Sequence, residues 1–122
     1  MTNPADLAPA ATDQSVTFLN IFSVPAPQKD RFLSHWKGTA RCMMAAPGFV
    51  RVRMLQVLTD PAELTFVMVG EWESGTALDV ARTNADWQQA IRQMNEDPEL
   101  DLSARPMVCT TTLDAGPADV LD

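Results

Sequence analysis

Asn20 is the first residue whose type and position suggest chemistry, because it interrupts an apolar row. In residues 16–24 alternate positions share one face of a predicted strand, and Asn20 lies between Phe18 and Phe22 on that face. A buried amide loses free energy unless it finds hydrogen-bond partners. Asn20 could therefore bind a ligand, or it could be bonded to an irregular backbone segment of a neighbouring strand.

A second candidate is Trp72, at the end of residues 64–74. The even positions of this stretch share one face of a predicted strand: Leu64, Phe66, Met68, Gly70 and Trp72. Ser74 is a suitable N-cap for a helix that follows. The Trp72 side chain could form the wall of a pocket, or it could simply fill the core.

Titratable and metal-binding residues give a weaker signal. His35 lies just off the apolar stripe of a predicted helix at residues 27–46, and it is either a rim histidine or a proton carrier. Cys42 and Cys109 are far apart, and two cysteines with one histidine make a poor zinc site. We therefore predict no metal, and two free thiols in a reducing cytoplasm.

The overall composition limits the class of partner. The chain has 122 residues and a formal net charge of −7, with a pI of about 4.5. This length predicts one domain, and the acidic balance argues against nucleic acid or an anionic membrane surface as the main partner. Residues 1–14 have neither the basic start nor the apolar centre of a signal peptide, and no apolar run is long enough to span a bilayer.

The order of the predicted elements indicates an α+β fold. Residues 1–14 are expected to be a flexible N-terminal arm, residues 15–113 the domain and residues 114–122 a tail. Within the domain we expect strands at 16–24, 49–58, 64–74 and 107–113. Helices are expected at 27–46 and 75–94, the second divided near residues 83–85, and an acidic loop at 95–105.

This β-α-β, β-α-β order predicts the ferredoxin-like split βαβ arrangement, a four-stranded antiparallel sheet with both helices on one face. The strands are apolar on both faces, as Leu19 and Ile21 show in the first strand and Val67 and Val69 in the third. A sheet open to water on one side should alternate more cleanly. We therefore expect a homodimer in which a second copy covers the open face.

Four stretches carry a resemblance to a known family: residues 17–22 (TFLNIF), 31–36 (RFLSHW), 47–49 (PGF) and 66–74 (FVMVGEWES). In this order and spacing they resemble the antibiotic biosynthesis monooxygenase family, a branch of the dimeric α+β barrel superfamily. The resemblance implies a protein similar to the cofactor-independent oxygenases that convert anthrones to quinones with O2. Asn20 and Trp72 match the pocket residues of these relatives, Arg92 lies near a pocket arginine, and Met68 stands where they have a strand-three asparagine.

On this resemblance Asn20 and Trp72 would stabilise a substrate carbanion, and no cofactor is expected. The residues expected to hold a flat aromatic substrate are Phe18, Phe22, Trp36, Phe66, Met68 and Arg92. One alternative is a non-catalytic binding or assembly barrel. Another is a haem-degrading monooxygenase, which is disfavoured because residues 78–82 of the second helix hold no histidine.

Overall fold

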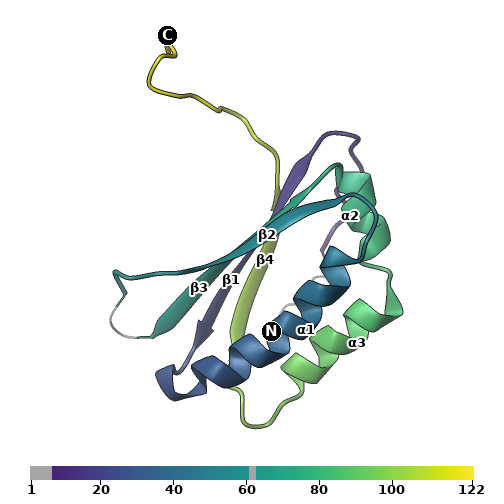
Figure 1. Ribbon diagram of the computed structural model, residues 1–122, viewed down its shortest axis with the longest axis vertical. Helices are drawn as coiled ribbons and strands as arrows, with labels where there is room; N and C mark the ends of the chain where they lie inside the picture. Colours follow the sequence, from purple (N-terminus) through teal and green to yellow (C-terminus); the bar gives the residue numbers. More distant parts are fainter. Residues whose placement is uncertain (1–6, 61–62) are drawn as a thin grey trace.

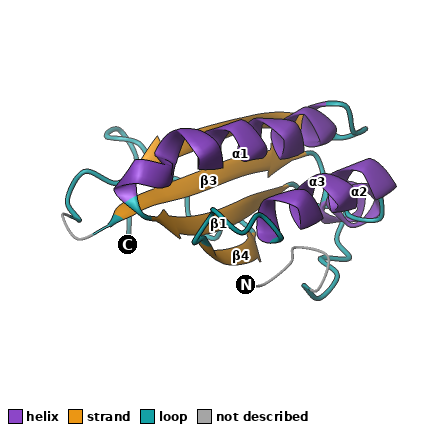
Figure 2. Cartoon of the chain, turned by 90° about the horizontal axis from the view of Figure 1, so that it is seen from below, coloured by secondary structure: helices purple, strands orange, loops and turns teal. Residues whose placement is uncertain are grey.

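The computed structural model describes residues 7–60 and 63–122, in which four antiparallel strands form one sheet with three α-helices on one of its faces (Figures 1 and 2). The elements are β1 (Val16–Val24), η2 (Ala26–Gln28), α1 (Lys29–Met44), β2 (Phe49–Gln56), β3 (Leu64–Trp72), α2 (Gly75–Ala81), α3 (Ala85–Asn95) and β4 (Ser103–Cys109). The strand order is β2-β3-β1-β4. The predicted ferredoxin-like α+β fold is therefore confirmed.

Local signals place the helix boundaries where the sequence indicated them. The Ser74 side chain accepts a hydrogen bond from the Ala77 N–H at 3.0 Å and caps α2. The Asn84 side chain accepts from the Trp87 N–H at 2.9 Å and starts α3 as a separate helix. The predicted division of the second helical region near residues 83–85 is therefore confirmed.

The last strand differs from its prediction. It begins at Ser103, inside the stretch that was predicted to be a loop, and it ends at Cys109 rather than near residue 113. Pro106 lies within it, opposite Asn20 of β1. A proline is tolerated there because β4 is an edge strand, where only one side of the backbone must bond to a neighbour. β2 is also shorter than predicted, since it ends at Gln56.

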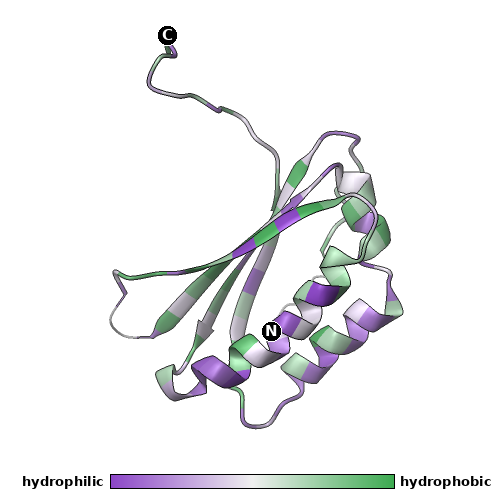
Figure 3. Cartoon of the chain, viewed as in Figure 1, coloured by the Kyte–Doolittle hydropathy of each residue, from purple (hydrophilic) through white to green (hydrophobic). Residues whose placement is uncertain are grey.

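The two faces of the sheet differ sharply. The covered face carries the core, and its largest fully buried side chains include Trp72, Phe18 and Phe32. The open face carries a half-buried apolar row from the two central strands: Leu19, Ile21, Val67 and Val69. Arg51 and Arg53 of β2 lie beside this row, and their alternation with valines is visible along β2 in Figure 3. The Arg51 guanidinium lies 3.9 Å from the Glu71 carboxylate on the neighbouring strand.

Residues 7–14, the described part of the arm predicted for residues 1–14, contact α2, and residues 1–6 lie outside the described part. The N–H groups of Ala10 and Ala11 donate to the Asp79 carboxylate at 2.9 and 2.8 Å. A side chain at Gly75 would collide with this segment, since its Cβ would lie 2.8 Å from the Ala10 Cβ. Burial by itself would raise the pKa of Asp79, but the hydrogen bonds from Ala10, Ala11 and Arg82 together lower it.

Residues 110–122 form no helix or strand and extend away from the sheet (Figure 1). This stretch contains the predicted tail, residues 114–122. It begins before residue 114 because β4 ends at Cys109, four residues before the predicted end of the strand. Among the described residues no helix is both long and apolar enough to cross a membrane.

Candidate functional site

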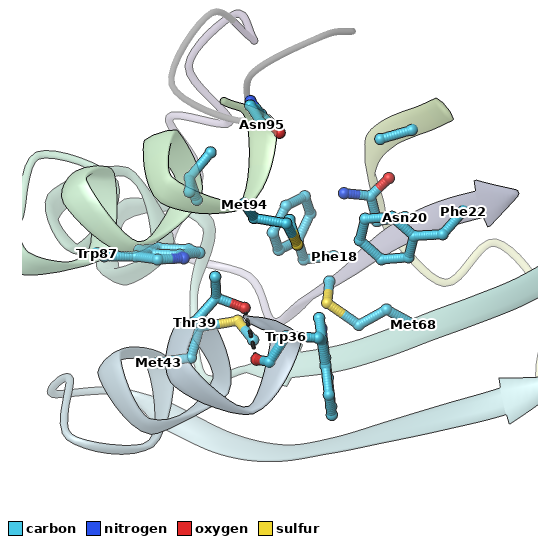
Figure 4. Close-up of a pocket in the computed structure, with 12 residues that line it drawn as sticks. Phe18, Asn20, Phe22, Trp36, Thr39, Met43, Met68, Trp87, Met94 and Asn95 are labelled. Carbon is cyan, nitrogen blue, oxygen red and sulfur yellow. Dashed lines mark hydrogen bonds between the residues drawn. The ribbon is translucent and has the colours of Figure 1, made fainter. Parts of the chain in front are cut away.

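A cavity lies between the covered face of the sheet and helices α1 and α3 (Figure 4). About 370 Å³ of space between atoms lies among its lining residues, but most of it is narrow gaps or open solvent, and the enclosed room is about that of one water molecule. Its lining residues are Phe18, Asn20, Phe22, Trp36, Thr39, Met43, Met68, Trp87, Ile91, Met94, Asn95 and Ala104. The wall is thus mostly apolar, with a few polar groups set into it.

Asn20 and Thr39 are the most deeply buried of these polar residues, each with 4% of its surface exposed. In the register of the sheet Asn20 lies opposite Met68 of β3 and Pro106 of β4. Neither neighbour has a polar side chain that could bond to the amide, and Asn20 Oδ1 has no hydrogen-bond partner. From the sequence, Asn20 could have been bonded to the backbone of a neighbouring strand. In the structure its side-chain oxygen makes no such bond and is available to a ligand.

Two more polar atoms in the cavity wall lack partners. The indole N–H of Trp36, on α1, and the side-chain oxygen of Asn95, at the end of α3, are both buried and unbonded. The Thr39 hydroxyl differs, because it donates to the Trp36 carbonyl at 2.8 Å, the bond drawn in Figure 4. Of the four unpartnered buried side-chain atoms found in residues 7–60 and 63–122, three belong to cavity-lining residues. Since such atoms are rare in proteins, their concentration here makes the cavity a candidate binding site.

Trp72 lies behind this wall rather than in it. It is 1% exposed and stacks on Trp87, with ring centroids 6.2 Å apart. In the sheet register it faces Val16, four positions from Asn20, which is roughly 13 Å along the strand. Its indole N–H has no partner, but it lies over Gly70 rather than in the cavity lining. The structure therefore keeps Trp72 and Asn20 on one face without bringing them together.

Three other predicted site residues also lie outside the lining. Phe66 is buried against Phe32, with ring centroids 5.4 Å apart. Arg92 is exposed and donates to the Gln89 side chain at 2.7 Å. The His35 Nε2 lies 2.8 Å from Asp97 Oδ2, so this ring is turned toward the loop after α3. Of the eight residues predicted in addition to His35, the lining includes five: Phe18, Asn20, Phe22, Trp36 and Met68.

Sequence reasoning missed the polar residues that the helices contribute to the lining. Thr39 lies three residues after Trp36 on the same helical stripe, so its position was readable. Asn95 lies four residues after Ile91 and continues the buried stripe of α3 by one turn. The predicted helix ends at Met94 and Asn95 falls in the predicted loop, which is why Asn95 was not among the predicted site residues.

Asp97 forms a polar clasp beside the cavity. The Arg31 guanidinium donates two hydrogen bonds to its carboxylate at 2.6 and 2.9 Å, and the Glu99 N–H donates a third at 2.9 Å. The ring of His35 makes a fourth contact. The bonds from Arg31, then the Glu99 N–H and His35, hold the pKa of Asp97 well below its usual value. This clasp fastens the α3–β4 loop to α1.

Within the residues described, no group of three or more His, Cys, Asp or Glu side chains is placed to hold a metal ion. Cys42 and Cys109 are free and half-buried.

The sheet and helices of this α+β domain enclose a mostly apolar cavity with a few polar groups, an arrangement typical of proteins that bind small molecules. Within that class, this chain belongs to the antibiotic biosynthesis monooxygenase family, whose model matches residues 15–93. No curated protein sequence matches the chain.

Solved structures support the same assignment. SnoaB, a cofactor-independent oxygenase from Streptomyces nogalater, is 25% identical, with 83% of this chain and 96% of that chain covered and a TM-score of 0.65. A protein from Nitrosomonas europaea with the same family name is 13% identical, with 85% and 96% covered and a TM-score of 0.66. At that identity the second likeness shows the fold alone.

Proposed function

We propose that the protein is a cofactor-independent monooxygenase that oxidises an anthrone-like aromatic polyketide with O2 to a quinone or hydroxylated product. The observation that carries this proposal is Asn20, a buried amide in a mostly apolar cavity, whose side-chain oxygen has no hydrogen-bond partner. The family assignment and the likeness to SnoaB, a cofactor-independent oxygenase, support it.

The reaction balances without another reductant. An anthrone loses a proton from its CH2 group, and the resulting carbanion gives one electron to O2. The radical pair combines into a C–O–O⁻ peroxide, which takes up the released proton. Loss of the second C–H proton with cleavage of the O–O bond gives the quinone C=O and one water. One oxygen atom of O2 thus enters the product and the other leaves as water.

Asn20 would act at the oxygen of the substrate that gains charge when the carbanion forms. A side-chain amide N–H can donate to an oxyanion, and a donor fixed in an apolar site is worth more than one in water. Trp72 was predicted as a second donor at this position. Because its ring lies behind Trp87, its part in the proposal is to hold the cavity wall in place rather than to touch the substrate.

The test is oxygen uptake by the purified protein with 1,8-dihydroxyanthrone, corrected for oxidation of the anthrone without protein. We expect uptake of one O2 for each quinone formed, and with ¹⁸O2 we expect one labelled atom in the quinone. No uptake above the uncatalysed rate would contradict the proposal and favour a binding barrel. Uptake only after haem is added would favour haem chemistry instead.

The proposal includes a homodimer formed through the open face of the sheet. The apolar row of Leu19, Ile21, Val67 and Val69 is only half-buried in one chain, so a second copy would remove it from water. Light scattering should give twice the chain mass of 13.4 kDa. Val67→Lys, which places a charge in the row, should give the monomer mass, and a monomeric wild type would contradict this part.

A reducing cytoplasm also belongs to the proposal, since both thiols are free.

A further inference from the structure

Asn95 faces two hollows at once. It lines the cavity, and it also lines a surface groove between the start of β4 and the end of β1, here called the outer groove. The other residues of the outer groove are Ser23, Pro25, Glu63, Leu100, Asp101, Leu102 and Ser103. Two of these, Ser23 and Ser103, directly adjoin the cavity residues Phe22 and Ala104 in the chain. Asn95 therefore stands where the cavity meets the surface.

The position of Asn95 is fixed by the loop that follows it. Two residues later, the Asp97 carboxylate is bonded to Arg31 and His35 of α1. Further on, the Asp101 carboxylate accepts from the Gln28 amide at 3.0 Å, and the Asp101 N–H donates to the same amide at 2.7 Å. The loop is thus bonded to α1 at one point and to the preceding η2 at another. A side chain held in this way loses little freedom when it binds a ligand.

Trp36 offers the complementary group. Its N–H is a donor, whereas the free atom of Asn95 is an acceptor, and both are buried without partners. Figure 4 shows the two residues at opposite ends of the cavity, Asn95 at the end of α3 and Trp36 on α1. A ligand that satisfies both atoms must carry a hydroxyl or N–H at one end and an acceptor oxygen at the other.

We propose that Asn95 and Trp36 determine specificity: Asn95 accepts a hydrogen bond from an aromatic hydroxyl at the entrance, and Trp36 donates to an oxygen at the far end. The inference rests on the proposed function, because it takes the ligand to be a flat oxygenated aromatic. It adds that a free hydroxyl, rather than the ring system alone, is required. A buried acceptor left unbonded by the wrong ligand is what enforces this requirement.

Binding of stable quinones tests the inference without any turnover. The probes are 2,6-dihydroxyanthraquinone, whose hydroxyl groups are too far from its carbonyl groups to bond to them, and its 2,6-dimethoxy counterpart, which keeps the acceptor oxygens but has no donor. By calorimetric titration we expect the wild type to bind the dihydroxy compound at least 10-fold more tightly. Asn95→Leu should abolish that preference, whereas Asn95→Asp, which keeps an acceptor, should retain it. Trp36→Phe should weaken both probes about 10-fold.

Gln93→Leu is the matched control, because it makes a similar change at an exposed position of α3. It should bind both probes as the wild type does. The inference is overturned if Asn95→Leu keeps the preference, if the wild type binds both probes equally, as it would if ordered water satisfied these atoms, or if neither probe binds. Binding with the expected preference but without oxygen uptake from the anthrone would sink the proposed function and leave this inference standing.

Discussion

Asn95 and Asp97 are two residues apart, and their side chains differ in hydrogen bonding. The Asp97 carboxylate is bonded to Arg31, to His35 and to the Glu99 N–H, whereas Asn95 Oδ1 has no partner at all. An unbonded buried oxygen costs about 1–3 kcal/mol, so a chain that saturates one of these side chains has no structural reason to leave the other empty. The contrast fits the proposal that the hydrogen bonds of Asp97 stabilise the fold and that the cavity atoms bind a ligand.

Asn20→Leu should give the largest effect that this comparison predicts. If Asn20 stabilises the substrate anion, oxygen uptake with the anthrone should fall about 100-fold or more, as when one oxyanion donor is lost. The thermal midpoint should stay the same or rise, because leucine has a similar volume and removes an unbonded amide oxygen. Steady-state oxygen uptake and thermal unfolding of the same sample measure both effects. Full activity in a folded variant would show that Asn20 is not part of the site.

Met68→Asn should give a smaller effect of the opposite sign. Met68 faces Asn20 across β1 and β3, and it stands where the anthrone oxygenases that this chain resembles have an asparagine. A second amide there would supply the missing partner of Asn20 and another donor for the substrate. We expect anthrone turnover to rise several-fold, measured by the rate of quinone formation. Such a gain would indicate that the natural substrate differs from a simple anthrone, while a loss would show that the methionine is needed for packing.

The part of the molecule that could be predicted from sequence is the part set by short periodicities. Alternation in β1 and β3 placed Asn20 and Met68 on the covered face, and the side chains of Ser74 and Asn84 mark the starts of two helices. The register between strands could not be derived this way, because it depends on packing of the whole sheet. Without it, the separation of Asn20 from Trp72 was invisible.

Helix ends set the other limit. Asn95 belongs to the buried stripe of α3, but a polar residue followed by an acidic stretch reads equally well as the start of a loop. Pro106 likewise reads as a strand breaker, and only its place on an edge strand makes it acceptable. Asn95 was therefore missed because it was assigned to the wrong element, whereas Thr39 lies in a helix that was predicted.

Trp72→Phe tests whether an unpartnered group outside the cavity also affects binding, since the Trp72 N–H has no partner and Trp72 does not line the cavity. Its removal should lower the free energy of unfolding by about 1–3 kcal/mol, because the stack on Trp87 loses volume. Affinity for the dihydroxyquinone, measured calorimetrically, should change much less than it does in Trp36→Phe. An equal loss of affinity in both variants would mean that the Trp72 N–H reaches the ligand after all.

Asp97→Asn should give the smallest effect on the site and a distinctive one on stability. Because the folded state holds the pKa of Asp97 below its usual value, ionised Asp97 stabilises the fold above the ordinary carboxyl pKa of about 3.9, and this contribution is lost as the pH falls further. The variant should therefore unfold at a lower temperature than the wild type at pH 7, and the difference should shrink by pH 3.

Thermal unfolding across this range measures the difference, and Asp114→Asn, in the exposed tail, is the matched control that should show none. The groups that face Asp97 are Arg31 and His35 of α1 and Glu99 of its own loop, and Arg31 stays charged throughout the range. A difference that does not depend on pH would mean that the clasp acts through packing rather than charge. The hydroxyl preference of the cavity should persist in Asp97→Asn, because the Asp101–Gln28 bonds still hold the loop that follows Asn95.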